Sequence, residues 1–249
     1  MIDERIASRR KDVREARKRA RLRRTLRMVG VVVLFAALVA VERSPLVALD
    51  DVRVSGVERL GETDVLDVAA LERGTSTLRL RLREVEQNVS ELPLVHTATA
   101  RRLDPLTVEI AVEERVPALQ VRGGGVNAIV DREGVVILRG VVSGIPEVWL
   151  PSAPPQPGAT VNDDAALVNA YEAWRSLSGP LRARVARYIA AGPDELSLLL
   201  IDDIEVRFGR AERTDEKVRA LGAVLADVAG TDVAIIDVRA PRAPVVASN

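Results

Sequence analysis

Alternation between apolar and polar side chains marks several strands in the first half of the chain. Residues 47–57 alternate in this way and stop at Gly56, which predicts a half-buried strand followed by a turn. A second strand is expected from Val95, and residues 107–114 alternate most regularly. The aliphatic side chains expected on the buried face of that last strand are Val108, Ile110 and Val112.

Two helices are expected between the first and the second of these strands. Thr63 is a candidate N-cap for the first helix, because its hydroxyl can accept a backbone N–H at the helix start. Residues 82–92 carry apolar side chains at helical spacings of three and four, and Pro93 ends that pattern. The predicted order is strand, helix, helix, strand, strand.

The second half of the chain mixes strands with helices. Two short strands are expected around a turn at Gly134, and residues 151–158 are rich in proline and predict a loop. Two helices and a hairpin around Asp202 and Asp203 follow, and a last strand closes the chain. The expected ranges are 163–177 for the first helix, 196–208 for the hairpin, 218–230 for the second helix and 233–241 for the last strand. The predicted fold class is therefore α+β.

An apolar run near the N-terminus differs from all these segments. Met28 to Val41 is fourteen residues without a charge, which as a helix covers about 21 Å of a ~30 Å hydrocarbon layer. Residues 1–27 before it carry twelve basic and four acidic residues, a net charge of +8. Because the whole chain is neutral, residues 28–249 carry a net charge of −8. A basic flank beside an apolar run predicts a single membrane anchor with the N-terminus in the cytoplasm.

Other interpretations of these N-terminal segments stay open. A cleaved signal peptide has an apolar region of similar length, although Leu38 and Ala40 fit its small-residue cleavage site poorly. A soluble core helix is a further alternative. The basic segment is also typical of a nucleic-acid-binding arm, but its position next to the apolar run favours an anionic lipid surface.

Composition and motif searches point away from catalysis. The chain has no cysteine, which excludes a thiol catalyst. Aromatic residues make up only 2% of it, which argues against an aromatic platform for single-stranded nucleic acid. The single histidine, His96, has no partner pattern for a metal site or a nucleophile. The paired acids are expected to mark a helix start (Asp163–Asp164), a hairpin turn (Asp202–Asp203) and a strand end (Glu113–Glu114). Glu114 with Arg115 is a candidate surface ion pair. We expect no catalytic residue, cofactor or metal.

Several short motifs, in their order along the chain, resemble the FtsQ/DivIB bacterial cell-division family. The matching stretches are Val54–Gly56, Leu92–Val95, Arg102 with Pro105, Glu114-Arg115-x-Pro117, Asp131-x-x-Gly134 and Asp237–Arg239. The family often has an aromatic residue where Asp104 and Ala240 stand in this chain. The resemblance covers nearly the whole sequence.

This resemblance implies a domain order and a role. The expected segments are a cytoplasmic basic tail at 1–27, a transmembrane anchor at 28–45, a POTRA domain at 46–117, an FtsQ-type β domain at 118–241 and a flexible tail at 242–249. The implied role is that of a non-enzymatic divisome scaffold at the plasma membrane, with the bulk of the chain outside the cytoplasm and at the septum. The alternative is a POTRA-containing envelope secretion or assembly factor, or a membrane-anchored enzyme.

The resemblance also implies partners and a site. The expected partners are division membrane proteins of the FtsB/DivIC and FtsL type, which dock on the closing strand in this family. Carried over to this chain, the partner-binding residues are Ile236, Asp237, Val238 and Arg239. We expect Val233 to Arg239 to be an edge strand, since only an edge strand has unpaired backbone groups to which a partner strand can add.

Overall fold

The computed structural model describes residue 24 and residues 26–228 and 233–248. The chain divides into two compact units, one formed by residues 1–55, 66–86 and 99–111, and the other by residues 56–65, 87–98 and 112–249. The expected basic tail at 1–27 falls mostly outside the described residues, as does Gly230, the expected end of the last helix.

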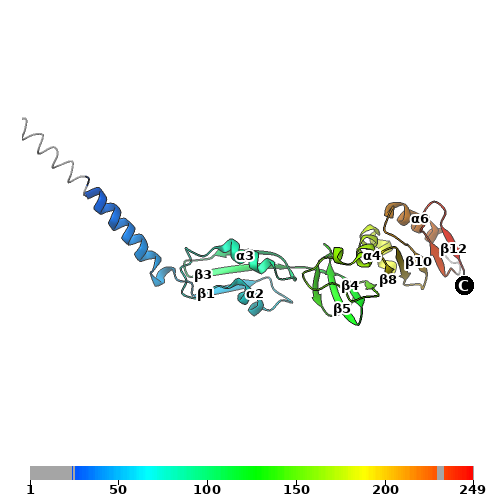
Figure 1. Ribbon diagram of the computed structural model, residues 1–249, viewed down its shortest axis with the longest axis horizontal. Helices are drawn as coiled ribbons and strands as arrows, with labels where there is room; N and C mark the ends of the chain where they lie inside the picture. Colours follow the sequence, from blue (N-terminus) through cyan, green and yellow to red (C-terminus); the bar gives the residue numbers. More distant parts are fainter. Residues whose placement is uncertain (1–23, 25, 229–232, 249) are drawn as a thin grey trace, which may run out of the picture. The chain divides into compact units, whose positions relative to one another are not determined.

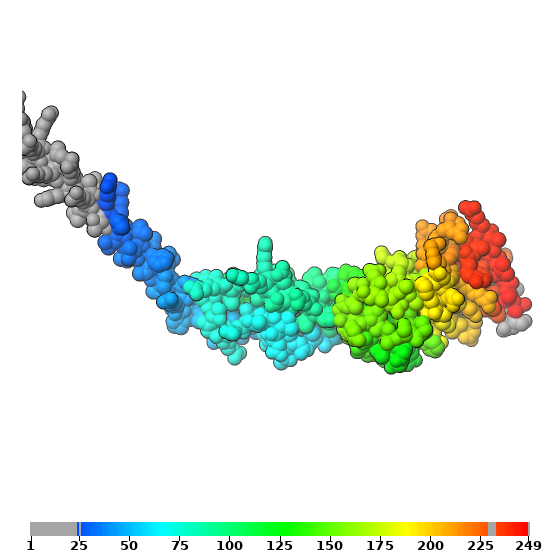
Figure 2. All heavy atoms as spheres, in the orientation of Figure 1, coloured from blue at the N-terminus to red at the C-terminus, as the bar shows by residue number. Residues whose placement is uncertain are grey.

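A helix over residues 26–42 precedes the first sheet. It ends ahead of the short 3-10 helix η1 (Pro45–Val47), whose N-cap Ser44 accepts the N–H of Leu46. Most of the large apolar side chains of this helix, drawn blue in Figure 2, are exposed. Within residues 24–248, apart from the undescribed positions, no helix has both the length and the apolarity needed to span a bilayer. The anchor expected at 28–45 is therefore not confirmed.

The three expected strands form one small sheet with the order β1-β3-β2. Its strands are β1 (Asp51–Ser55), β2 (Val95–Arg102) and β3 (Thr107–Glu114), and its helices are α2 (Glu62–Ala69) and α3 (Leu82–Ser90). β1 runs parallel to β3, and the strand-helix-helix-strand-strand order is confirmed (Figure 1). Thr63 lies inside α2 and is not its N-cap, because the helix already begins at Glu62.

A nine-stranded sheet forms the body of the larger unit, with the order β12-β11-β10-β9-β8-β7-β4-β5-β6. Its strands are β4 (Pro117–Gly123), β5 (Val126–Asp131), β6 (Val136–Arg139), β7 (Glu147–Trp149), β8 (Val185–Gly192), β9 (Glu195–Leu200), β10 (Glu205–Arg207), β11 (Ile235–Asp237) and β12 (Val245–Ala247). The helical segments are η2 (Val161–Asp163), α4 (Ala165–Ser176), α5 (Gly179–Arg184) and α6 (Thr214–Asp227).

One row of side chains crosses this sheet and forms the centre of its core. Neighbouring strands place these residues in register, and each is fully buried: Val121, Val148, Tyr188, Leu198, Val206 and Ile236. Leu167, Tyr171 and Trp174 of α4 belong to the same core. Asp164 caps α4 by accepting the N–H of Leu167 at 2.9 Å, which agrees with the expected acidic helix start.

The turns form where the sequence places glycine or aspartate. Gly124 and Gly125 connect β4 to β5 with φ angles of 52° and 76°, and Gly134 has a φ of 85° between β5 and β6. Asp203, with a φ of 62°, lies in the turn between β9 and β10. The structure adds β4, β7, β8, β12 and α5, which the sequence patterns did not predict. Because β12 occupies residues 245–247, the expectation of a flexible tail at 242–249 is wrong.

Candidate functional site

The four residues expected to bind a partner lie on or just after β11, which is not an edge strand. β11 runs parallel to β10 on one side and antiparallel to β12 on the other. The chain reverses after β11 through a turn in which the N–H of Ala243 donates to the carbonyl of Ala240 at 3.0 Å. The returning strand thus pairs with the backbone groups of β11 that a partner was expected to use. The prediction that Val233 to Arg239 is the edge is wrong.

Burial separates the four expected residues into two kinds. Ile236 and Val238 are fully buried in the core, so neither side chain is available to a partner. Arg239 is exposed but already paired, because its Nε lies 3.0 Å from Oδ1 of Asp237 and its Nη2 lies 2.5 Å from Oδ2. Hydrogen bonds from Arg239 lower the pKa of Asp237, so the pair is ionised at neutral pH. Of the four expected residues, only the ion-paired Asp237 and Arg239 reach solvent.

β12 forms the margin of the nine-stranded sheet beyond β11. Figure 2 shows the C-terminal residues (red) at the surface. Val246 continues the buried row of the core, since it is the register partner of Ile236, but 41% of it is exposed. Val245, the register partner of Asp237, is 63% exposed. Among the described strands, none pairs with the outer side of β12, which is therefore an open edge with two exposed valines, next to the Asp237–Arg239 pair.

The sequence pattern does not predict β12, because the strand is only three residues long. The available signal was a pair of β-branched residues, Val245 and Val246, following Pro241 and Pro244. Prolines at such spacing indicate a turn, and a turn after one strand brings the next strand alongside it. Such a short run has too few positions to show an alternating pattern.

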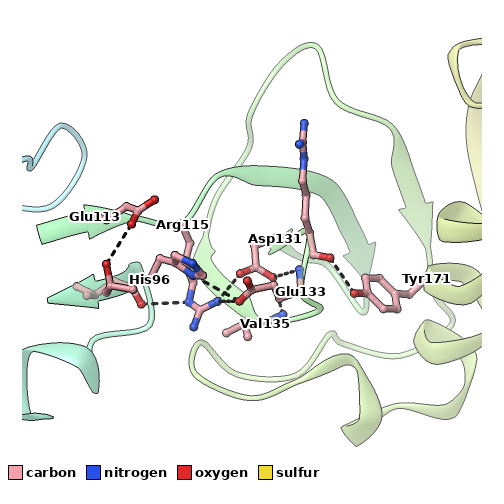
Figure 3. A network of polar contacts seen from close by, with 10 residues as sticks. His96, Glu113, Arg115, Asp131, Glu133, Val135 and Tyr171 are labelled. Atoms are coloured by element: carbon pink, nitrogen blue, oxygen red, sulfur yellow. Dashed lines mark hydrogen bonds and ion pairs between the residues drawn. The ribbon is translucent and has the colours of Figure 1, made fainter. Parts of the chain in front are cut away.

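A second polar site surrounds Arg115 within the larger unit (Figure 3). Nη1 of Arg115 lies 2.7 Å from Oδ2 of Asp131 and 2.7 Å from Oε2 of Glu133, and its Nε donates to the carbonyl of Val95 at 3.1 Å. The Arg115 side chain is 17% exposed and that of Asp131 only 4%. Arg115 thereby joins the start of β2 to the turn between β5 and β6.

Asp131 also organises that turn from inside. Its Oδ1 accepts the N–H groups of Glu133 at 2.9 Å and Val135 at 2.8 Å. On the other side of the turn, the hydroxyl of Tyr171 in α4 donates to the carbonyl of Arg132 at 2.9 Å. These contacts give the Asp131-x-x-Gly134 motif a structural role, because Asp131 shapes the turn and holds Arg115.

The side chains of Glu114 and Arg115 do not pair with each other, which corrects the expected surface ion pair. Oε1 of Glu114 accepts the N–H groups of Glu58, Arg59 and Leu60 at 2.7, 2.8 and 2.9 Å. Burial opposes ionisation of Glu114, but these three hydrogen bonds outweigh it and lower the pKa of the carboxyl group. Glu114 is the last residue of β3 and Arg115 follows it outside the strand, and the two side chains reach different partners.

His96 lies beside the Arg115 network and is partly exposed, with Nδ1 at 3.5 Å from Oε2 of Glu133. A small hollow of ≈170 Å³ next to these residues is lined by His96, Glu113, Arg115 and Asp131, among others. The two carboxylates and the Val95 carbonyl hold the guanidinium of Arg115 through Nη1 and Nε, so Arg115 is a structural tie between these segments. In the part of the chain that the structure describes, no three histidine or acidic side chains cluster as metal ligands would.

Comparison with known proteins adds two family matches. Residues 47–115 match the model of the FtsQ-type POTRA domain, and residues 118–239 match that of the C-terminal domain of cell division protein FtsQ/DivIB. Both the Arg115 network and the β10–β11 segment fall within or beside these matched regions.

Several proteins similar to this chain are named Cell division protein FtsQ. The protein from Mycolicibacterium smegmatis is 30% identical over 90% of this chain and 67% of its own length. That from Streptomyces griseus is 32% identical over 81% of this chain and 97% of its own length. That from Corynebacterium glutamicum is 26% identical over 80% of this chain and 88% of its own length. The chain therefore belongs to the FtsQ/DivIB cell-division family and has a role in the division complex.

Proposed function

We propose that this chain is a non-enzymatic scaffold of the divisome, held in the plasma membrane by residues 28–45. Its part outside the cytoplasm would bind division membrane proteins of the FtsB/DivIC and FtsL type during septum formation. The observation that carries the proposal is the open edge of β12, which exposes Val245 and Val246 beside the Asp237–Arg239 pair. An edge of this kind accepts an added strand from another protein.

Membrane anchoring is supported by the sequence and by the exposed helix. The charge of +8 over residues 1–27, against −8 over the remainder, orients the N-terminus to the cytoplasm. The helix over residues 26–42 exposes apolar side chains all around, and such a helix requires an apolar environment. Its exposed large apolar residues are Leu26, Met28, Val29, Val31, Val32, Val33, Leu34, Phe35, Leu38 and Val41.

Strand addition at β12 would extend the row of core side chains by one strand. Val246 stands at the end of that row and is half-covered, so an apolar partner side chain beside it would remove apolar surface from water. The backbone groups of β12 that point away from β11 would supply the hydrogen bonds. Asp237 and Arg239 would lie near the contact and favour a partner carrying a matching charge pair.

The test is binding of the full chain, in detergent or nanodiscs, to the extracytoplasmic segment of the FtsB-like protein. Val246→Asp places a charge in the new contact and should weaken binding at least tenfold, about 1.4 kcal/mol. Val141→Asp is the matched control, because Val141 is 69% exposed in the loop between β6 and β7, outside the proposed contact. Equal binding by both variants would contradict a contact at β12.

Truncation after Ala243 distinguishes the two possible edges. It removes β12 and uncovers β11, so binding should be lost if the partner adds to β12. Retained or tighter binding would mean that the partner pairs with β11 in place of β12, and it would overturn the proposal. Circular dichroism of each variant checks that the sheet is intact.

A further inference from the structure

A short antiparallel pairing in the smaller unit brings two exposed leucines to one end of it. The segment after η1 pairs with residues 75–77, through a bridge between Ala48 and Ser76 and a bond of 2.8 Å from the N–H of Thr77 to the carbonyl of Val47. Leu46 and Leu78 directly flank the bonded residues Val47 and Thr77, so both lie at this end of the unit. Leu46 is 73% exposed and Leu78 is 61% exposed.

The turn between β2 and β3 belongs to the same end of this unit. The carbonyl of Leu106 accepts the N–H of Asp50 at 2.9 Å, and the carbonyl of Pro105 accepts the hydroxyl of Thr77 at 2.7 Å. Leu103 and Leu106, the apolar residues of that turn, are exposed as well. Four exposed leucines thus gather around residues 46–50 and 75–78.

Arginines accompany these leucines. Arg79, which forms an ion pair with Glu42, and Arg81, whose Nη1 lies 2.7 Å from Oε1 of Glu84, are both largely exposed. Arg43 and Arg79 line a hollow of ≈530 Å³ together with Ser44 and Thr75. Exposed leucines flanked by arginines are the composition that binds the interface of an anionic membrane.

The position of this surface along the chain indicates its occupant. The apolar helix ends at residue 42, and Leu46 follows four residues later. Four residues reach at most about 14 Å, so an anchored chain must keep Leu46 close to the membrane surface. The bilayer surface is therefore the apolar and anionic surface that lies within reach of these residues.

We propose that Leu46, Leu78, Leu103 and Leu106, with Arg43, Arg79 and Arg81, form a lipid-contact surface that rests on the anionic phospholipid headgroups of the outer leaflet. The leucines enter the interface, and the arginines contact lipid phosphates while their methylene stems cover apolar surface. This inference rests on the proposed membrane anchoring, and it adds that the smaller unit is held against the bilayer and does not swing freely on its linker.

The absence of cysteine from the sequence permits a direct test in the full chain. Leu78→Cys and Leu66→Cys, each labelled with an environment-sensitive NBD fluorophore, are compared in nanodiscs containing phosphatidylglycerol and spin-labelled lipid. Leu66 is an exposed leucine of the same unit, but it lies on α2, outside the lipid-contact surface. The label at 78 should be quenched by the spin-labelled lipid and blue-shifted, and the label at 66 should not.

A charge-neutral variant tests the arginines separately. Arg43→Gln, Arg79→Gln and Arg81→Gln, combined in the Leu78→Cys chain, should reduce the bound population of the surface, by about fivefold for each arginine that contacts lipid. Nanodiscs made of phosphatidylcholine alone should likewise reduce the bound population of the Leu78→Cys chain that keeps its arginines. Equal quenching in both lipid mixtures would overturn the role assigned to the arginines.

The outcomes separate this inference from the anchoring on which it rests. A chain that does not co-purify with nanodiscs would contradict the anchor itself. A chain that co-purifies, but whose labels at 78 and 66 are quenched equally, would leave the anchor in place and overturn the lipid-contact surface.

Discussion

Single side chains carry much of the local order in the larger unit, and Arg115 is the clearest case. Arg115→Met would leave Asp131, with a side chain only 4% exposed, without its cation. Because an unpaired buried charge is costly, we expect the free energy of unfolding to fall by about 3 kcal/mol. The measurement is urea unfolding followed by tryptophan fluorescence, since Trp149 and Trp174 both lie in the larger unit.

Arg59→Met is the control for that prediction. The guanidinium of Arg59 lies 3.5 Å from Oε2 of Glu114 and is 46% exposed, so its loss should cost less than about 1 kcal/mol. A comparable loss from both variants would mean that Arg115 is no more than a surface arginine.

Glu114 should make stability depend on pH. Although burial raises its pKa, three backbone hydrogen bonds lower it overall below the ordinary value of 4.5. A depressed pKa in the folded state gives stability that is present above the unfolded-state pKa and is lost as the pH falls through the folded-state pKa. The stability advantage of the wild type over Glu114→Gln should therefore shrink below about pH 4.5. An advantage that stays constant down to about pH 3 would contradict this account.

At the scale of elements, Gly56 permits the chain just after β1 to lie close against the backbone of β3. Its φ is +83°, and an added Cβ would lie 2.0 Å from the backbone oxygen of Val112. Gly74 has a similar φ of +86° but open space around the missing Cβ. Gly74→Ala should thus cost only the left-handed backbone strain, about 1–2 kcal/mol, and Gly56→Ala about 1–3 kcal/mol more. Melting temperatures from circular dichroism compare the two, and equal losses would show that the contact with Val112 relaxes easily.

At the scale of the whole molecule, the charge asymmetry of the chain predicts its topology. The N-terminus should remain in the cytoplasm, and residues from about Ser44 onward should lie outside it. Protease added to spheroplasts should digest the larger part of the chain and leave an N-terminal tag intact, whereas lysed cells should lose both. A soluble secreted species beginning after Ala40 would instead identify the apolar run as a signal peptide.

Local patterns in the sequence determined most of the elements of this protein. The alternation over residues 107–114 gave β3 and its buried face, and the apolar spacing and acidic start of residues 163–177 gave α4. The turns at Gly134 and Asp203 formed where the sequence placed residues that tolerate positive φ. These features were predictable because side-chain period, helix capping and turn conformation depend on neighbours within a few residues. β8 was not predicted, because its pairing with β9 is irregular between Val185 and Arg187 and between Ala190 and Gly192. These irregularities interrupt the apolar–polar alternation of the strand.

Tertiary structure alone decided which groups meet across long separations. It placed β12 beside β11, so the edge of the sheet lies at residues 245–247 and not at the expected residues 233–239. It also directed Arg115 to Asp131 and Glu133, and Glu114 to the backbone of residues 58–60. The order of the strands and the partner of each charged side chain depend on which distant segments pack together. The periodicity of the sequence does not contain that information. For this reason the sequence identified the family and most of its elements, but only the fold located the open edge of the sheet.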